Sequence, residues 1–382
     1  MRQTETSLMD QAMSATGLSD FGDHQEFRTG LRVLVGAAEE AGVTGETLAG
    51  LEAGWLASLQ IRLQMVQLRK EHPEIAAQPI EGPLAVIGLP RTGTTALVDL
   101  LAQDPAARAP LQWETANLFP PSSKDGWATD PRIAGLQAVF DQMASVNPIV
   151  ALGLHTFGAM LPDECNSFLT LDFWSPNANV TRALPSYSEW MRFSGLVRPY
   201  VTHHMALQHL QTHGPAGRWT LKSPFHLFAI PQFLYQYPDA MLVHTHRNPI
   251  ELMPSMCGLY ATIRGQGPGD PGRLETGPEL LKLWGTGLQR GIAARRDPAI
   301  EARVFDVSHK AIAADPMGTV RSVYDHFDLP FTAAAEQAMR AWIEHPAQHM
   351  SSVKFSLADF GLDADQVEAG FGDYGARFGH LF

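Results

Sequence analysis

Apolar residues in the first eighty positions recur at the spacing of an α-helix. The pattern begins at Phe27, and the stretch 51–68 repeats it with Arg62 and other basic residues outside the apolar face. Residues at i, i+3, i+4 and i+7 share one face of a helix. We therefore predict a helical N-terminal region over residues 1–80, with its apolar faces packed against a core.

The pattern changes after Pro79. Short apolar runs follow at residues 83–88, 218–222, 240–246 and 303–307, and a helical pattern comes after each of them. Such runs, bounded by Pro or Gly, are typical of strands that are buried on both faces of a parallel sheet. Strands that alternate with helices predict an α/β fold with a parallel sheet flanked by helices.

The remaining segments set the expected domain organisation. Residues 105–215 are rich in Pro, Trp and His, and the Gly/Pro-rich segment 265–277 predicts a loop. We expect three parts, which are an N-terminal helical cap (1–80), an α/β core (81–345) with helical insertions at about 120–215, and a C-terminal tail (346–382) packed on the core.

Composition and charge narrow the class of partner. The 382 residues are 45% hydrophobic and 18% charged, which is typical of a globular protein, and the formal net charge is −12. An acidic chain is a poor partner for a nucleic acid polymer, which selects a basic surface. Two cysteines cannot form a disulfide framework. A homodimer is the default oligomer, because twofold assemblies are the commonest.

Two further patterns bear on location. Residues 1–23 mix charged and polar side chains, so we expect neither a signal peptide nor a membrane anchor. No run of about 18 apolar residues occurs, so we expect no membrane span. A cytoplasmic protein is the resulting prediction.

The segment Gly88-Leu-Pro-Arg-Thr-Gly-Thr-Thr95 carries the main chemical signal. It fits the P-loop pattern G-x-x-x-x-G-K-[ST] except that Thr94 replaces the lysine. A loop between a strand and a helix N-terminus directs backbone N–H groups at an anion, and the helix dipole favours negative charge there. Arg91 adds a cation. A strand, turn and helix can be mere architecture, but this combination predicts a phosphate-binding loop.

The sequence lacks the acidic residue that a P-loop kinase or NTPase uses to hold Mg²⁺ after a neighbouring strand. The run 240–246 is followed by Arg247 and Asn248 instead. A cation therefore stands where a magnesium ligand would be expected. This indicates group transfer without a metal, from a nucleotide whose leaving group is a phosphate.

These motifs resemble the PAPS-dependent sulfotransferase family, and its bacterial branch in particular. The resemblance covers most of the chain and implies PAPS as the donor, PAP as the product and no metal. Arg247 with Ser255 eight residues later is similar to the family's pair for the 3′-phosphate. Lys222, in Leu-Lys-Ser-Pro, resembles a lysine of the tyrosylprotein sulfotransferases that acts near the transferring group. The residues that resemble the loop for the 5′-phosphosulfate are Pro90, Arg91, Thr92, Gly93, Thr94 and Thr95.

Sulfuryl transfer needs cations for the developing charge and a base for the acceptor. Arg91 and Lys222 are the candidate cations. Glu114 is the first candidate base, because it lies where the second strand should end and because tyrosylprotein sulfotransferases have a glutamate at a similar distance. His226, which opens the helical pattern just after Lys222, is the alternative base.

The acceptor pocket is expected within residues 150–200, where aromatic and apolar side chains gather. His155, Phe157, Glu164 and Trp174 are the candidate substrate-binding residues, although a core would use the same residue types. The acceptor is a small molecule, a lipid or a sugar with a hydroxyl or amine. Two other functions remain open, which are a P-loop kinase or NTPase and a noncatalytic nucleotide-binding protein on the same fold.

Overall fold

The computed structural model describes residues 3–144, 147–175, 177–194, 200–344 and 353–382. The chain forms two compact units. The helical unit comprises Met1–Ile80, Glu114–Asp130 and Cys165–Pro215, and the sheet unit comprises Glu81–Trp113, Pro131–Glu164 and Ala216–Phe382. The domain boundary that we predicted at residues 345–346 lies outside the described residues.

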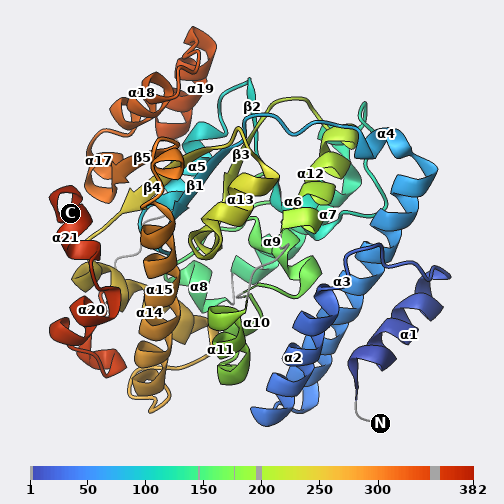
Figure 1. Ribbon diagram of the computed structural model, residues 1–382, viewed down its shortest axis with the longest axis horizontal. Coiled ribbons are helices and arrows are strands. Elements are labelled where there is room, and N and C mark those ends of the chain that lie inside the picture. Colours follow the sequence, from blue (N-terminus) through green and yellow to red (C-terminus); the bar gives the residue numbers. More distant parts are fainter. Residues whose placement is uncertain (1–2, 145–146, 176, 195–199, 345–352) are drawn as a thin grey trace. The chain divides into compact units, whose positions relative to one another are not determined.

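The helical unit is built from the predicted N-terminal helices and from segments that return to it later in the chain (Figure 1). α3 is the longest helix described in this unit. The unit's elements are α1 (Glu5–Thr16), α2 (Phe27–Glu40), α3 (Gly45–Glu71), α4 (Pro73–Ala76), the 3₁₀ helix η1 (Trp127–Thr129), α9 (Asn166–Leu169), η2 (Thr170–Asp172), α10 (Asn177–Val180), α11 (Pro185–Phe193) and α12 (Tyr200–His213), while α6 (Gln112–Ala116) spans its boundary.

A buried arginine on α3 ties this unit together. We expected Arg62 outside the apolar face, but its side chain is only 3% exposed. Its guanidinium donates to the Phe21 carbonyl (2.8 Å), to Asp172 (2.5 Å) and to Thr202 (3.1 Å). The expectation was wrong because a buried guanidinium is tolerated when its donors find acceptors, which here come from distant segments.

The sheet unit contains a parallel sheet, as predicted, and its five strands lie in the order β2-β3-β1-β4-β5. The strands are β1 (Leu84–Gly88), β2 (Ala107–Arg108), β3 (Arg218–Lys222), β4 (Met241–His246) and β5 (Val304–Ser308). The four longer strands match the four apolar runs of the sequence. β1 lies at the centre, where β3 and β4 pair with its two edges, so the loop that follows it opens at the middle of the sheet's carboxyl edge.

Helices cover the sheet on both faces, as expected for a parallel sheet. On one face, Leu84 and Val86 of β1 pack with α5, α18 and α19, while η3 lies against β1 and packs on α15. The helices of this unit are α5 (Thr94–Leu101), α7 (Pro131–Ala144), α8 (Pro148–Ala151), η3 (Pro224–Phe228), α13 (Ile230–Gln236), α14 (Pro249–Ile263), α15 (Arg273–Ala294), α16 (Pro298–Glu301), α17 (His309–Ala314), α18 (Pro316–His326), α19 (Ala333–Glu344), η4 (Ala358–Phe360), α20 (Ala364–Phe371), α21 (Tyr374–Phe378) and η5 (Gly379–Leu381).

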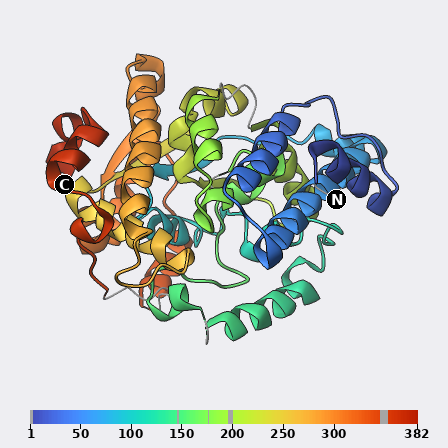
Figure 2. The ribbon, with the colours of Figure 1, turned by 90° about the horizontal axis from the view of Figure 1, so that it is seen from below.

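The C-terminal elements belong to the sheet unit. α20 packs against α14 and α15, and Figures 1 and 2 show it beside these helices. Part of α15 was predicted to be loop, because residues 265–277 are rich in Gly and Pro. The helix instead begins at Arg273, and a Cβ on Gly277 would overlap the Phe360 carbonyl. This glycine therefore permits close packing of α15 against η4. From the sequence alone, a glycine needed for packing cannot be distinguished from a glycine in a loop.

The local structure around Glu114 also differs from the prediction. We placed this residue at the end of the second strand, but β2 ends at Arg108 and Glu114 lies in α6. Pro110 follows the strand and lacks the N–H that a sheet ladder needs. The chain then turns, and the N–H of Gln112 donates to the Leu161 carbonyl at 3.0 Å.

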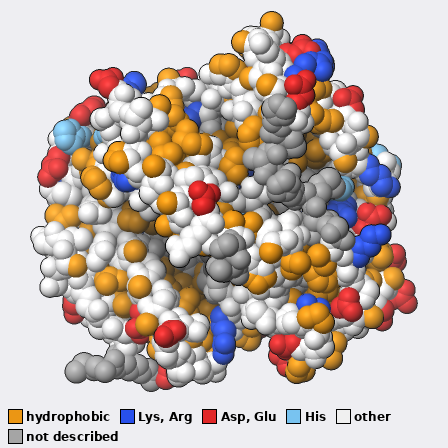
Figure 3. Space-filling model, turned by 180° about the vertical axis from the view of Figure 1, so that it is seen from behind, with side chains coloured by type: hydrophobic (Ala, Val, Ile, Leu, Met, Phe, Trp, Pro, Cys, Tyr) orange, Lys and Arg blue, Asp and Glu red, His pale blue; other side chains and the backbone are white. Residues whose placement is uncertain are grey.

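The face seen in Figure 3 is neither mainly positive nor mainly negative. Lys and Arg side chains lie among Asp and Glu side chains there. Among the described helices, none has the length and apolar character needed to cross a membrane.

Candidate active site

The loop between β1 and α5 has the backbone of an anion-binding loop. Gly88, Arg91 and Gly93 have φ angles of 144°, 70° and 90°. Positive φ is costly for arginine, so the surrounding structure must hold the loop in this conformation. Gly93 is also the N-cap of α5, whose first N–H groups have no partner within the helix. The loop thus presents backbone donors at the positive end of a helix dipole.

Thr92 fixes this loop to the sheet. Its hydroxyl donates to the Leu89 carbonyl (2.7 Å) and lies 2.6 Å from the Thr245 hydroxyl on β4. Gly88 approaches the same strand so closely that a Cβ would lie 2.8 Å from the Thr245 carbonyl oxygen. The hydroxyl of Thr92 is therefore engaged in hydrogen bonds that hold the loop, so Thr92 can contribute only its backbone N–H to ligand binding.

The structure brings together the predicted residues Arg91, Arg247 and Ser255. Arg91 Nε donates to Ser255 Oγ at 3.2 Å, and Arg91 Nη1 donates to the Leu154 carbonyl at 2.8 Å. Arg247 Nη1 in turn donates to the carbonyl oxygen of Arg91 at 3.1 Å. Two guanidinium groups and a hydroxyl therefore meet beside the loop, although Arg91 lies far from Arg247 and Ser255 in the sequence.

The electrostatics of this cluster favour an anion. Burial and the nearby charge of Arg247 lower the pKa of Arg91, which means that two cations lie close together. Among the described residues, the buried Nε of Arg247 has no hydrogen-bond acceptor, and Glu251 Oε2 lies 3.7 Å away. Neighbouring cations with an unused donor are the arrangement that a phosphate or sulfate group stabilises.

His309 is a neighbour of this cluster that the sequence analysis did not find. Its ring carbon lies 3.3 Å from the position that a Cβ on Gly93 would take. Burial, followed by the charges of Arg247 and Arg91, lowers its pKa. The available signal was its position directly after β5, because strand ends at the carboxyl edge line the ligand crevice.

Lys222 connects the loop to an acidic side chain. This residue ends β3 and is 2% exposed. Its ammonium group donates to Thr95 Oγ1 at 3.0 Å and to Glu164 Oε1 at 2.6 Å. Glu164 is brought there by an antiparallel bridge between Leu111 and Pro162. The structure therefore joins a predicted catalytic residue, a loop residue and a predicted substrate-binding residue.

His155 lies close to the same group of charges. Burial, together with the positive charges of Lys222 and Arg91, lowers its pKa, while Glu164 opposes this shift. The ring is therefore neutral at neutral pH. It makes an edge contact with Phe157, whose ring centroid is 4.6 Å away, and the next ring in the row is Phe140 at 5.3 Å from Phe157.

His226, the alternative base, lies in a different environment. Its side chain is fully buried in η3, and its ring packs against Phe233 at a centroid distance of 4.7 Å. Burial lowers the pKa of His226 to about 3. Such a side chain accepts a proton poorly at neutral pH, so its environment is that of a core residue.

Glu114 and Trp174 belong to the helical unit. Both side chains are buried, and the carboxylate of Glu114 accepts a hydrogen bond from Trp127 Nε1 at 2.7 Å. Their roles as a base and as a substrate-binding residue stay predictions.

Comparisons with known proteins identify the family of the chain. The family model for the sulfotransferase family matches residues 83–333. Sulfotransferase STF1 from Mycobacterium tuberculosis H37Rv is similar in structure, with 32% identity, a TM-score of 0.80 and coverage of 97% of this chain and 99% of that chain. Sulfotransferase STF9 from Mycobacterium avium has 28% identity, a TM-score of 0.87 and coverage of 98% and 96%.

A curated relative matches over a shorter range. The omega-hydroxy-beta-dihydromenaquinone-9 sulfotransferase Stf3, from Mycobacterium bovis and from Mycobacterium tuberculosis, is 27% identical over 110 residues. The aligned part covers 28% of this chain and 28% of each relative. The family model, by contrast, spans more than half of the chain and includes the loop, Lys222, Arg247 and Ser255. The resemblance seen in the sequence and the predicted α/β fold are thus confirmed, and the chain belongs to the sulfotransferase family.

Proposed function

We propose that this protein transfers a sulfuryl group from PAPS to a hydroxyl or amine of an acceptor. The observation that carries the proposal is the meeting of Arg91, Arg247 and Ser255 beside a P-loop-like turn, with Arg247 Nη1 at 3.1 Å from the Arg91 carbonyl. Such a site suits a nucleotide with phosphates at two ends. β4, the strand next to β1, is followed by Arg247 rather than by a magnesium ligand.

Each part of the donor has candidate partners. The backbone N–H groups of residues 91–95 and the hydroxyls of Thr94 and Thr95 are assigned to the 5′-phosphosulfate, while Pro90 shapes the loop without donating. Arg247 and Ser255 are assigned to the 3′-phosphate, which a guanidinium can bind through two parallel hydrogen bonds. The same cations neutralise charge without a metal ion, so no metal is required by this assignment.

The transfer step is assigned to Lys222 and its neighbours. The acceptor oxygen forms a bond to sulfur, the bond from sulfur to the bridging phosphate oxygen breaks, and its electron pair leaves with PAP. Lys222, held by Thr95 at 3.0 Å, stabilises the charge that builds on the leaving group. Glu164, 2.6 Å from Lys222, takes the proton of the acceptor.

The choice of base can be tested with matched amide variants. Glu164→Gln should lower kcat by roughly 10² to 10⁴ while PAP binds as before, because a positioned base contributes about that factor. Glu114→Gln should retain most of the activity. If Glu114→Gln abolishes turnover and Glu164→Gln does not, Glu114 is the base, as the sequence predicted.

The row of His155, Phe157 and Phe140 supports an acceptor with an apolar part next to its hydroxyl. These rings lead from the neighbourhood of Lys222 towards α7, of which no residue is buried. Stf3, which matches over part of the chain, is named for a lipid-like quinone acceptor. We therefore place lipid and phenol acceptors before sugars.

One binding comparison separates the competing functions. Calorimetric titration should show that PAP binds in the absence of metal, whereas ATP with Mg²⁺ binds weakly. Binding of ATP with Mg²⁺ and not of PAP would establish a kinase or NTPase instead. Tight PAP binding without sulfation of any member of a lipid, phenol and sugar panel would favour a noncatalytic nucleotide-binding protein.

A further inference from the structure

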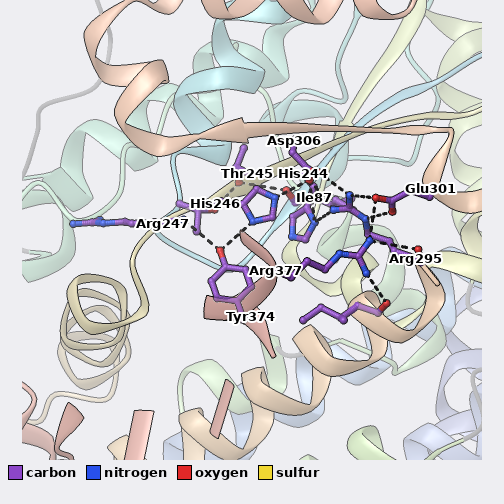
Figure 4. A network of polar contacts seen from close by, with 12 residues as sticks. Ile87, His244, Thr245, His246, Arg247, Arg295, Glu301, Asp306, Tyr374 and Arg377 are labelled. Carbon is purple, nitrogen blue, oxygen red and sulfur yellow. Dashed lines mark hydrogen bonds and ion pairs between the residues drawn. The ribbon is translucent and has the colours of Figure 1, made fainter. Parts of the chain in front are cut away.

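A buried polar cluster on β4 and β5 is not used by the reaction described above. It consists of His244, His246 and Asp306, whose ligand atoms lie within reach of one another, a set that can bind a metal ion (Figure 4). Here a fixed cation already lies among them, because Arg295 Nη1 is 2.9 Å from His244 Nδ1 and 2.6 Å from Asp306 Oδ1. The cluster therefore has a different role.

The positions of the protons in this cluster follow from its charges. Burial favours a neutral Asp306, but hydrogen bonds from Arg295 and His246 outweigh it and hold the pKa of Asp306 well below its usual range. An ionised carboxylate can only accept, so His246 Nε2, at 2.8 Å, must donate to it. Burial lowers the pKa of His246, so the ring is neutral and Nδ1 has a free lone pair.

Tyr374, on α21 near the C-terminus, extends this chain of hydrogen bonds. Its hydroxyl lies 3.2 Å from His246 Nδ1 and must donate its single proton there. The hydroxyl oxygen then accepts the backbone N–H of Arg247 at 3.3 Å. Burial raises the pKa of Tyr374, so the hydroxyl stays protonated. The bonds thus run in one direction from the Arg247 backbone to the Asp306 carboxylate.

The end point of this chain is the residue that we assign to the 3′-phosphate. Arg247 follows the last residue of β4 and precedes Asn248, which caps α14 by accepting the Ile250 N–H at 2.9 Å. Its backbone therefore sits between two regular elements and belongs to neither. Figure 4 shows the Arg247 side chain leaving this point away from the cluster, while its backbone meets Tyr374.

We propose that Tyr374, oriented by His246 and Asp306, is a positioning residue that holds the backbone of Arg247 in place for binding of the donor's 3′-phosphate. The inference rests on the proposed function, and it makes the C-terminal segment a part of the donor site. Arg377, one turn further, serves the same scaffold, because it pairs with Glu301 at 3.0 Å.

Removal of one oxygen atom tests this role. Tyr374→Phe keeps the ring that stacks on His246, at a centroid distance of 5.7 Å, and deletes only the hydroxyl. We expect the Kd of PAP and the KM of PAPS to rise about three- to tenfold, as for the loss of one hydrogen bond. The kcat should stay within about twofold, because the reacting groups are untouched.

A matched control distinguishes positioning from general stability. Tyr324 is also buried in the sheet unit, and its hydroxyl donates to Asp104 Oδ2 at 2.7 Å. Tyr324→Phe should lower the Tm and leave the PAP affinity unchanged, whereas Tyr374→Phe should lower the PAP affinity as well as the Tm. The proposal is overturned if Tyr324→Phe loses as much PAP affinity as Tyr374→Phe, because the loss would then follow from lower stability rather than from positioning of Arg247.

A double-mutant cycle with Arg247→Met provides the sharper readout. Once the guanidinium is removed, loss of the Tyr374 hydroxyl should weaken PAP binding no further. The proposal is overturned if Tyr374→Phe binds PAP like the wild type, or if the two losses simply add. Failure of the wild type itself to bind PAP would refute the proposed function, and this inference with it.

Discussion

At the scale of the residue, the site is defined by two neighbouring cations, Arg91 and Arg247. Arg91 and Arg247 lie close enough for the charge of one to lower the pKa of the other, and the loop around Arg91 has a strained φ of 70°. Their residue types and their places after strands were predictable. His309 was not, because a single histidine after a strand has no distinctive pattern.

Burial of His226 leads to a prediction about stability and pH. Burial lowers the pKa of His226 to about 3 in the folded protein, against about 6.5 in the unfolded chain, so the unfolded state binds the proton first as the pH falls. Its contribution to stability is complete above about pH 6.5 and declines by roughly 1.4 kcal/mol per pH unit below it.

His226→Gln should therefore show a smaller decline in the free energy of unfolding between about pH 7 and pH 5 than the wild type. Urea denaturation at a series of pH values measures this difference. Equal pH slopes for the two proteins would show that His226 does not take up a proton on unfolding, contrary to its buried environment.

At the scale of the element, strands were predicted better than helices. Each long strand is a short apolar run bounded by breakers, and these runs gave β1, β3, β4 and β5 to within a few residues. The sequence pattern misplaced two element boundaries, both next to a glycine or a proline. α15 begins inside the expected loop, and Glu114 follows a proline that ends β2 early. In both places, contacts with a segment distant in the sequence determine the local structure.

The packing of α15 on η4 can be tested at its glycine. Gly277→Ala would place a methyl group against the Phe360 carbonyl, so we expect a loss of about 1–3 kcal/mol in stability, as for overpacked sites. Gly135→Ala, in the exposed helix α7 with nothing within 4 Å of the new Cβ, should be neutral or stabilising by up to about 1 kcal/mol. Thermal unfolding of both variants checks this, and an unchanged Tm for Gly277→Ala would contradict the packing.

At the scale of the molecule, the carboxyl edge of the sheet explains why residues far apart in the sequence could be predicted to lie together. Lys222 ends β3, while Thr95 and Arg247 come after β1 and β4, so a parallel sheet brings all three to this edge. The bond between Lys222 and Glu164 could not be predicted, because it depends on the bridge between Leu111 and Pro162. The net charge of −12 offers a phosphorylated donor no general attraction, so binding depends on the local cations.

The most direct test of the central claim is a transfer assay with PAPS labelled in its sulfuryl group. The protein is incubated with labelled PAPS and a metabolite extract, and PAP and labelled products are separated and identified by mass spectrometry. We predict stoichiometric PAP and sulfated product with the wild type, and a loss of about 10² to 10³ in rate with Lys222→Met. No transfer by the wild type, or undiminished transfer by Lys222→Met, would contradict the account.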